Sequence, residues 1–366
     1  MKLLSVICLI FIMAMDGIEG NNPVWSVIPG RLMQVDVSPA DVVWGVNSAH
    51  FIFLRVGSQG QWKHIRGLLK HVSVGEAGVW GVNKQDDIWY REGVSSSNVA
   101  GTKWKKVGGL LKQIDSGPPG IVYGVNRGDN VYCRTGITTA RPQGKSWKIL
   151  DKKLKYISCG VLGCWGANAN DNIFFRVGVT SDKCEGTKWK HISGKLKQVE
   201  VSSGGVVLGV NSANQLFGRD GITAANPTGT RWVFIPNPGF KHVSAGKSAI
   251  WAINAADYIF YYDGYLKQID SGPPGIVYGV NGGDNIYCRT GITTFRPQGR
   301  SWKILDGKLK YISCGVLGCW GVNANDDIYF RVGVTPGKCE GTKWVHIRGK
   351  LKQIEVSLIY SCNSFI

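Results

Sequence analysis

One phrase recurs along most of this 366-residue chain and restricts what the chain can fold into. Its clearest copy is GIVYGVNRGDNVYCR, residues 120–134, and the other copies are slightly altered versions of it. Those copies end at Arg55, Arg91, Arg176, Arg219, Tyr262, Arg289 and Arg331. A unit that recurs about every 40 residues indicates an architecture in which each unit buries its core against its neighbours. The chain is therefore a tandem repeat.

Each unit is predicted to form four short antiparallel strands. It begins with a run such as residues 69–74, whose alternating apolar and polar positions predict a strand with one buried face. The repeated phrase follows, and its Asn-x-x-Asp core, Asn83 and Asp86 in one copy, separates two apolar runs as a turn does. A Gly-rich connector then leads to a strand that starts with tryptophan, Trp104 in the same unit.

Four strands in each unit are typical of the blade of a β-propeller, where radial stacking buries the sheet faces and protects the edges. The alternative all-β architecture, a sandwich, does not need an equal unit repeated this many times. The composition agrees, since 50 glycines and only 19% charged residues suit short strands joined by tight turns. The expected fold class is all-β, a β-propeller.

The repeat is interrupted once, after DYIFYYDG at residues 257–264. There the sixth unit lacks its tryptophan strand, and the chain passes directly to the next first strand. A spare tryptophan strand, PVWSVIPG at residues 23–30, opens the chain after its first apolar stretch. We therefore expect a six-bladed ring over residues 21–264, closed by the strand of Trp25.

Residues 265–357 are a copy of an earlier part of the chain. Leu266 to Leu358 repeats Leu111 to Ser203 at a constant offset, and a short tail at 358–366 follows. The copy supplies two blades and a lone first strand, and its exposed sheet edges favour aggregation unless another chain covers them. Two alternatives stay open: a single ring of about eight blades, and a copy that comes from an erroneous gene model.

The first residues indicate export from the cell. MKLLSVICLIFIMAM joins a basic start to a short apolar core, which predicts a signal peptide over residues 1–20. No later stretch is apolar enough to span a bilayer. We therefore expect a secreted, extracellular protein that does not insert into membranes.

At this point the motifs resemble a known family. The combination of VWGVN, DNIYCRTGIT, GTKW and GKLKQIEV resembles the tectonin repeat, and residues 154–179 are similar to the matching run of fish-egg lectins. The resemblance implies a secreted β-propeller lectin, related to the tachylectin-1 type of horseshoe crabs, that binds N-acetylglucosamine-like sugars and bacterial surface polymers such as lipopolysaccharide. The duplicated extension departs from the family pattern, which leaves the oligomeric state open, a homo-oligomer included.

Eight cysteines fall into two equivalent sets of four. Cys159 and Cys164 flank a short turn, and Cys133 and Cys184 lie on one face of neighbouring blades, so strand positions favour pairing within each couple. Four cysteines allow three connectivities, and the others stay open. Disulfides are favoured over metal ligation for these cysteines. No cofactor is expected, although a structural calcium ion is left open. The remaining cysteine, Cys362, is expected to be free or to form an intermolecular bond. The expected pairs are Cys133–Cys184, Cys159–Cys164, Cys288–Cys339 and Cys314–Cys319.

The charge suggests the class of partner. A formal net charge of +18 favours polyanions. Each first strand begins with a basic residue near the Asn-x-x-Asp turns, and a ring of these would attract anionic bacterial polymers, although a solvated surface explains them equally well. The same charge attracts nucleic acid, but export argues against such a partner. These residues are Arg31, Lys70, Lys112, Lys155, Lys197 and Lys241.

A sugar site needs a planar aromatic side chain and a few fixed polar groups. One turn position recurs with a polar side chain, and equal sites on several blades would give a multivalent lectin. Turn formation is the alternative role of these residues. Trp104 and Trp189 are candidates for stacking on the sugar, with packing between blades as their alternative role. The turn candidates are Asp86, Asp129, Asp171, Asn214 and Asp257.

Catalysis finds little support in the sequence. His64, His191 and His346 occupy one repeated position, so they follow the repeat and form no catalytic constellation. Recurring aspartates resemble the paired carboxylates of a glycosidase, but an enzyme needs one distinctive site. We expect no enzyme, and the alternative to a lectin is a structural or protein-binding propeller of the egg envelope.

Overall fold

The computed structural model describes residues 25–356 apart from 247–248, 263–265, 274, 282, 295, 297–298 and 301. The described residues form strands β1–β32, which make eight four-stranded antiparallel sheets. The expected all-β propeller fold is confirmed. The expected signal peptide at 1–20, the tail at 358–366 and Cys362 lie outside the described residues. Within the described part of the chain, no helix has the length and apolarity needed to cross a membrane.

Six of the sheets, called blades 1–6 in chain order, lie within residues 25–262. Blade 1 is β2 (Gln34–Val37), β3 (Val42–Val46), β4 (Phe51–Val56) and β5 (Lys63–Leu68). Blade 2 is β6 (His71–Gly75), β7 (Gly78–Val82), β8 (Asp87–Arg91) and β9 (Trp104–Leu110). Blade 3 is β10 (Gln113–Ser116), β11 (Val122–Val125), β12 (Asn130–Arg134) and β13 (Trp147–Lys153). Blade 4 is β14 (Tyr156–Gly160), β15 (Gly163–Ala167), β16 (Asn172–Val177) and β17 (Lys188–Lys195). Blade 5 is β18 (Gln198–Val201), β19 (Val207–Val210), β20 (Leu216–Arg219) and β21 (Trp232–Ile235). Blade 6 is β22 (Phe240–Ala245), β23 (Ile250–Asn254), β24 (Tyr258–Tyr262) and β1 (Ser26–Arg31).

The other two sheets lie in a separate compact unit, whose described residues begin at 266. Blade 7 is β25 (Leu266–Ser271), β26 (Val277–Asn281), β27 (Asn285–Arg289) and β28 (Trp302–Lys308). Blade 8 is β29 (Tyr311–Gly315), β30 (Gly318–Val322), β31 (Asp327–Val332) and β32 (Lys343–Lys350).

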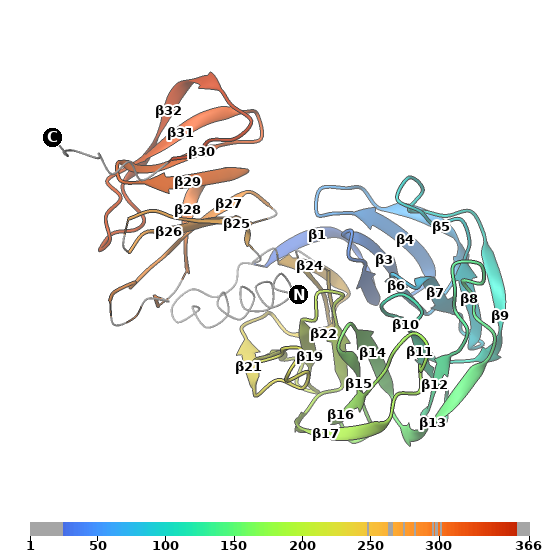
Figure 1. The fold of residues 1–366 in the computed structure, drawn as a ribbon. Helices are drawn as coiled ribbons and strands as arrows, with labels where there is room; N and C mark the ends of the chain where they lie inside the picture. The colour runs from blue at the N-terminus through green and yellow to red at the C-terminus, as the bar shows by residue number, and fades with distance from the viewer. Residues whose placement is uncertain are drawn as a thin grey trace. The chain divides into compact units, whose positions relative to one another are not determined.

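Blade 6 takes its fourth strand from the start of the chain. β1 pairs antiparallel with β24, with Ser26 opposite Tyr261 and Val27 opposite Phe260. Just before β1, the indole Nε1 of Trp25 donates to the carbonyl of Pro236 at 3.0 Å. The first strands β2, β6, β10, β14, β18 and β22 contact one another in that order, and β22 contacts β2 again, so they surround one axis (Figure 1).

The tryptophans of the repeat fill the spaces between these blades. Trp44, Trp80 and Trp165 come from the repeated phrase and are almost completely buried. Each lies edge-on to the fourth-strand tryptophan of the next blade, as Trp80 does to Trp147 at 6.5 Å between ring centroids. Aromatic side chains bury a large apolar area, and edge-to-face pairs add to it. The repeat therefore builds its own interfaces.

The glycine of the repeated phrase is required by close packing. A Cβ atom on Gly81 would lie 2.3 Å from Cδ1 of Leu69, which stands two residues before the first strand of the same blade. A Cβ on Gly166 would lie 2.5 Å from Cδ1 of Leu154 in the same way. In these blades the leucine and the glycine of the phrase thus form one packing unit, whereas blade 6 has Phe240 and Ala252 at the two positions.

Candidate functional site

The turn between the second and third strands has the same backbone in every blade. In blade 2, Oδ1 of Asn83 accepts the N–H groups of Gln85 at 3.0 Å and of Asp87 at 2.9 Å. Asp86 has a φ of 72°, in the left-handed region that Asn and Asp tolerate better than most residues. The backbone therefore accounts for the residue type at this position. The left-handed residues of these turns are His50, Asp86, Asp129, Asp171, Asn214, Asp257, Asp284 and Asp326.

In blades 2, 3, 4, 6 and 8, a lysine at the start of the first strand forms an ion pair with the acidic turn residue of the same blade. The ring of basic residues expected from the sequence is therefore largely neutralised by its own blades. Two members of the ring are exceptions. Arg31 does not begin a first strand as expected, because it ends β1, the fourth strand of blade 6, where it donates to the carbonyl of Ala256. Lys197 donates to the neutral amide oxygen of Asn214. Burial and the nearby charge of Lys155 lower the pKa of Lys197. The pairs are Lys70–Asp86, Lys112–Asp129, Lys155–Asp171, Lys241–Asp257 and Lys310–Asp326.

The candidate aspartates differ in whether the carboxylate oxygen that the lysine leaves free has another partner. The second oxygen of Asp86 accepts from Arg127 at 2.5 Å, and that of Asp171 accepts from Ser212 at 2.6 Å. Within the described residues, the second oxygens of Asp129 and Asp257 have no such partner, and these side chains are 25% and 27% exposed. The last two carboxylates each keep one oxygen without a protein donor among the described residues, so they are the candidates best placed to accept a hydrogen bond from a ligand.

The structure places Trp104 and Trp189 away from these turns. Trp104 is opposite Arg91 on β8, at the far end of the strand from Asp86, and Trp189 is opposite Arg176 on β16 in the same way. The guanidinium carbons of these arginines lie 5.3 and 5.1 Å from the tryptophan ring centroids. Both tryptophans pack within the propeller instead of forming a surface platform beside the turns.

Two exposed aromatic side chains do adjoin the turns. Tyr258 follows Asp257 and is 41% exposed, and Phe51 follows His50 and is 44% exposed. The guanidinium carbon of Arg31 lies 3.8 Å from the centroid of Tyr258, over one face of the ring. The sequence does carry a signal for both, since the other copies have Asp, Asn or Gln at this position.

A second group of polar side chains surrounds the axis. The first strands of blades 1, 3 and 5 carry glutamine and an acid two residues later, and those of blades 2, 4 and 6 carry histidine or tyrosine and then serine. The alternation is visible in the sequence, but its role becomes apparent only when the first strands lie side by side. The pairs are Gln34 and Asp36, His71 and Ser73, Gln113 and Asp115, Tyr156 and Ser158, Gln198 and Glu200, and His242 and Ser244.

The axial side chains join each blade to the next. Nε2 of Gln34 donates to the carbonyl of Val72 at 2.8 Å, and the N–H of Val72 donates back to Oε1 at 3.1 Å. The carboxylate of Asp36 accepts from the hydroxyls of Ser73 and Ser244, each at 2.7 Å. Asp36 therefore connects blade 1 to both of its neighbours.

Burial governs the protonation of this axial group. Desolvation raises the pKa of Asp36, and desolvation with repulsion between the acids raises the pKa values of Asp115 and Glu200. Desolvation lowers the pKa of His71 to about 3 and that of His242 to about 4. Burial thus disfavours the charged forms of both the acids and the histidines.

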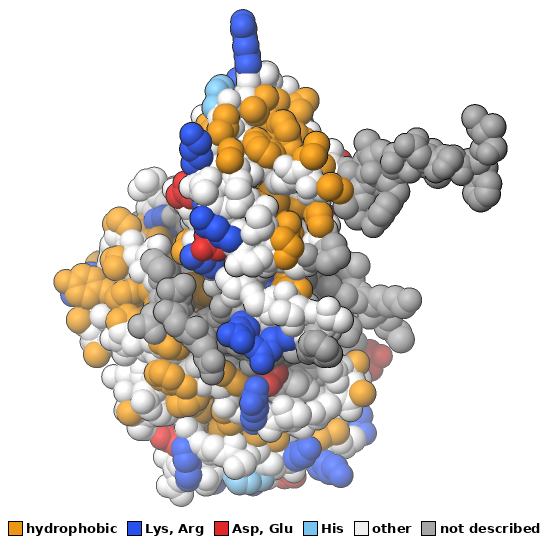
Figure 2. Space-filling view, turned by 90° about the vertical axis from the view of Figure 1, so that its left-hand side faces the viewer, with side chains coloured by type: hydrophobic (Ala, Val, Ile, Leu, Met, Phe, Trp, Pro, Cys, Tyr) orange, Lys and Arg blue, Asp and Glu red, His pale blue; other side chains and the backbone are white. Residues whose placement is uncertain are grey.

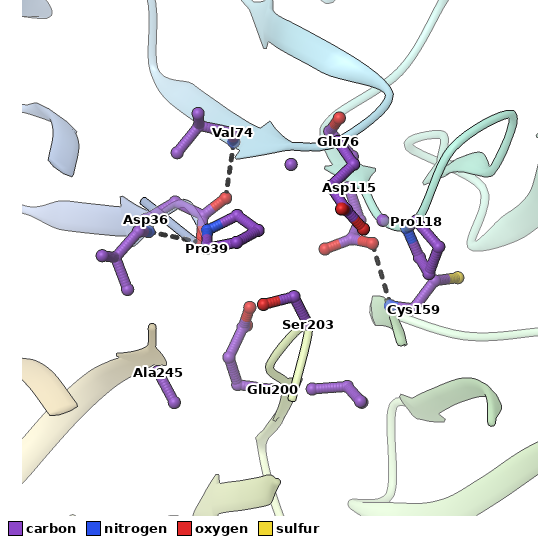
Figure 3. Close-up of a pocket in the computed structure, with 15 residues that line it drawn as sticks. Asp36, Pro39, Val74, Glu76, Asp115, Pro118, Cys159, Glu200, Ser203 and Ala245 are labelled. Atoms are coloured by element: carbon purple, nitrogen blue, oxygen red, sulfur yellow. Dashed lines mark hydrogen bonds between the residues drawn. The ribbon is translucent and has the colours of Figure 1, made fainter. Parts of the chain in front are cut away.

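The three acids border a small cavity of about 20 Å³ (Figure 3). Asp36, Asp115 and Glu200 reach it from three different blades, and Ser203 lies beside them. A space of this size is enough for about one water molecule, whereas small-molecule sites usually occupy roughly 300 Å³ or more. The axial group therefore fits a role in joining the blades and does not fit a sugar ring.

The four disulfides of the structure join the cysteines in the expected couples: Cys133–Cys184, Cys159–Cys164, Cys288–Cys339 and Cys314–Cys319. The first and third connect neighbouring blades, and the other two close the hairpin at the tip of blades 4 and 8. Tyr123 donates from its hydroxyl to the carbonyl of Cys184, which adds a second connection between blades 3 and 4.

Comparison with known proteins gives the following matches. The profile of the Tectonin domain matches residues 12–153, 145–240 and 235–364 of this chain. Fish-egg lectin of Cyprinus carpio is 38% identical over 92 residues, which span 23% of this chain and 38% of that relative. The alignment thus covers well under two thirds of the relative's length.

Solved structures also superpose on the chain, at low identity. YCF48 from Cyanidioschyzon merolae has a TM-score of 0.38 at 12% identity, over 81% of this chain and 95% of that chain. Yeast RCC1 (Prp20) bound to Kap60 has a TM-score of 0.42 at 12% identity, over 78% of each chain. Superpositions at these scores carry no argument about this chain.

Proposed function

We propose that this chain, which belongs to the tectonin family, is a secreted carbohydrate-binding lectin. The observation that carries the proposal is the Tectonin match along nearly the whole chain, with a lectin as the curated relative of one part of it. The four disulfides are consistent with an extracellular protein. Family and fold point to a protein that is not an enzyme.

The proposed ligands are N-acetylglucosamine-like sugars and the bacterial surface polymers that contain them, such as lipopolysaccharide and peptidoglycan. The net charge of +18 supports anionic polymers. Because the lysine ring is largely paired internally, we assign this attraction to the surface as a whole rather than to that ring. An egg-protective or innate immune role follows from such ligands.

We place the best sugar site at the turn of blade 6. Asp257 keeps one carboxylate oxygen free within the described residues, and Tyr258 beside it offers an exposed aromatic ring. A pyranose needs this combination of a flat apolar face and a fixed acceptor for its hydroxyls. The turn of Asp129 is a second site, without the aromatic side chain. Weak sites on several blades would act together on a polymer.

We also propose that residues 21–264 form a closed six-bladed ring and that residues 265–357 are a separate two-blade extension. The pairing of β1 with β24 and the cyclic contacts of the first strands support the ring. The division of the described residues into two compact units supports the extension.

A structural or protein-binding propeller without sugar recognition is the second candidate. The occupied carboxylates of Asp86 and Asp171 favour it, because these turns are complete without a ligand. Sugar binding by the turn of blade 6 decides between the two.

The test uses the full chain and immobilised N-acetylglucosamine. We expect retention that free sugar elutes, and about tenfold weaker binding for Tyr258→Ala, a loss of roughly 1.4 kcal/mol. Phe234→Ala is the matched control, since Phe234 is 50% exposed on the fourth strand of blade 5 and adjoins no turn of this type. Retention that ignores free sugar but vanishes in moderate salt would show attraction by charge alone. No retention at all would overturn the lectin proposal.

A further inference from the structure

Blades 7 and 8 meet through the same interface as blades 3 and 4. The buried core between blades 7 and 8 includes Tyr278, Val280, Leu309 and Cys319. Their counterparts Tyr123, Val125, Leu154 and Cys164 occupy the same places between blades 3 and 4. The copy has therefore kept one complete interface between blades.

The faces on either side of that interface are open. On blade 4, Trp165 and Phe175 are each 1% exposed beneath blade 5, whereas their counterparts on blade 8, Trp320 and Phe330, are partly exposed. On the opposite side of the unit, Ile269 of blade 7 is 46% exposed. Figure 2 turns this unit toward the viewer and shows hydrophobic side chains gathered on its surface.

The uncovered face of blade 7 faces away from blade 8. Ile114, the counterpart of Ile269 in blade 3, is fully buried in the core between blades 2 and 3. Blade 7 has no preceding blade in its own unit at the position that blade 2 has beside blade 3. Large uncovered apolar faces of this kind mark an interaction surface.

The two open faces match each other. In the ring, the face of blade 4 is covered by Val207, Phe217 and Trp232 of blade 5. Blade 7 carries Val277 and Trp302 at two of these positions and a tyrosine at the third. A second copy of this chain would therefore bring to blade 8 the same kinds of side chain that blade 5 brings to blade 4.

The alternation of axial side chains also favours blade 7 of a second copy as the neighbour of blade 8. A blade with tyrosine and serine, such as blade 8 with Tyr311 and Ser313, is followed in the ring by a blade with glutamine and an acid. The strand β25 carries Gln268 and Asp270 at those positions. Gln268 and one oxygen of Asp270 already form hydrogen bonds with blade 8 of the same chain, as their counterparts on β10 do with blade 4 in the ring. The other oxygen of Asp270 has no donor among the described residues and can accept from Ser313 of a second copy.

Residues 351–356 partly occupy the position beside blade 8 where the first strand of a next blade would lie. The N–H of Val356 donates to Oγ of Ser313 at 3.0 Å, as Val201 does to Ser158 in the ring. Glu355 accepts hydrogen bonds from Tyr311 and Ser313. Yet residues 351–356 belong to no sheet among the described residues, and Leu351 is 43% exposed where its counterpart Leu196 is 2% exposed. This segment contacts blade 8 without covering it.

We propose that a second copy of this chain binds head to tail, with β25 and the open face of its blade 7 replacing residues 351–356 on blade 8. Such a contact joins two different surfaces, and it closes into a ring when the rotation per copy divides a full turn. Two of the six blades of the first unit span one third of a turn. Three copies therefore complete a second propeller, and the assembly is a closed trimer. The proposal does not depend on sugar binding.

The test measures the mass of the full chain by native mass spectrometry and light scattering over a range of concentrations. We expect three times the mass of one chain. Ile269→Lys should leave a monomer, because it puts a charge into the contact between copies. Ile304→Lys is the matched control, since both isoleucines are 46% exposed but Ile304 lies on the fourth strand β28. It should leave the trimer intact.

A second variant tests the exchange of strands. Glu355→Ala removes the acceptor of Tyr311 and Ser313, so it should loosen residues 351–356 and lower the concentration at which half of the chains are trimeric about fivefold. Circular dichroism should show the same fold for all variants. A wild-type chain that stays monomeric, or that associates equally well with Ile269→Lys, overturns the proposal. A dimer or an open-ended series of masses overturns the closed ring.

Discussion

Asp86 serves both the backbone and an ion-pair cluster. It adopts a φ of 72°, and its carboxylate is shared between Lys70 and Arg127. The sequence predicted two roles for this position, turn former and sugar ligand. The local spacing of Asn83 and Asp86 was enough to predict the first. The second depends on which oxygens remain available, and that is decided by Arg127, which is far away in the sequence.

His242 should make stability fall in acid. Its Nε2 donates to the carbonyl of Val35 at 2.7 Å, and burial lowers its pKa from 6.5 to about 4. Between these pH values His242 is protonated in the unfolded chain but not in the folded chain. The free energy of unfolding therefore falls as the pH falls. The loss is on the order of 3 kcal/mol.

His242→Gln keeps a donor for Val35 but cannot titrate. Urea unfolding at pH 7 and pH 4.5 should show a smaller loss of stability for the variant than for the wild type. The raised pKa values of Asp36, Asp115 and Glu200 act in the opposite direction, because protonation favours their folded form. They contribute to both proteins, so the difference between the two reports on His242. Equal losses would contradict the prediction.

The hairpin is the element that the sequence predicted best. The strands β7 and β8 and the turn between them come from one continuous phrase, and their pairing needs no distant residue. The disulfides add two kinds of restraint to these elements. Cys159–Cys164 spans 5 residues within one hairpin, and Cys133–Cys184 spans 51 residues between two blades.

Removing these two disulfides should have unequal effects. Restraining a longer loop removes more entropy from the unfolded chain. Replacing Cys133 and Cys184 with alanine should therefore lower the free energy of unfolding by about 4 kcal/mol, and the same change at Cys159 and Cys164 by about 2 kcal/mol. Guanidinium unfolding of the two double variants measures the difference. The reverse order would show that local packing and not loop length controls their effect.

The ring depends on pairing between the two ends of the first unit. β1 and β24 are separated by most of that unit, and Trp25 packs against Phe240 with 4.6 Å between ring centroids. The sequence suggested this closure because one tryptophan strand was missing and another was spare. It did not suggest the alternation of acids and serines around the axis, because that pattern has meaning only when six first strands lie side by side.

A chain that ends after Tyr262 should fold by itself. The described contacts of blades 1–6 lie in one compact unit, and β1 supplies the strand that completes blade 6. Such a chain should show one cooperative thermal transition and the β-sheet circular dichroism of the ring. A chain that also lacks residues 21–31 is the control, and it should be destabilised because β24 then has an open edge. An unfolded chain ending at Tyr262 would contradict the closure.

The sequence by itself determined the repeat unit, its hairpins and the family, because each rests on local spacing or on motifs repeated in order. It favoured the disulfide couples, and the structure decided among the connectivities that were open. Only the tertiary structure decided which of the repeated side chains remain available to bind a ligand. The lysine ring is largely neutralised by the turn aspartates, Trp104 and Trp189 are taken up by packing, and Tyr258 is left exposed beside Asp257. The physical reason is that identical residues acquire different surroundings when the blades close, since availability depends on neighbours supplied by other blades.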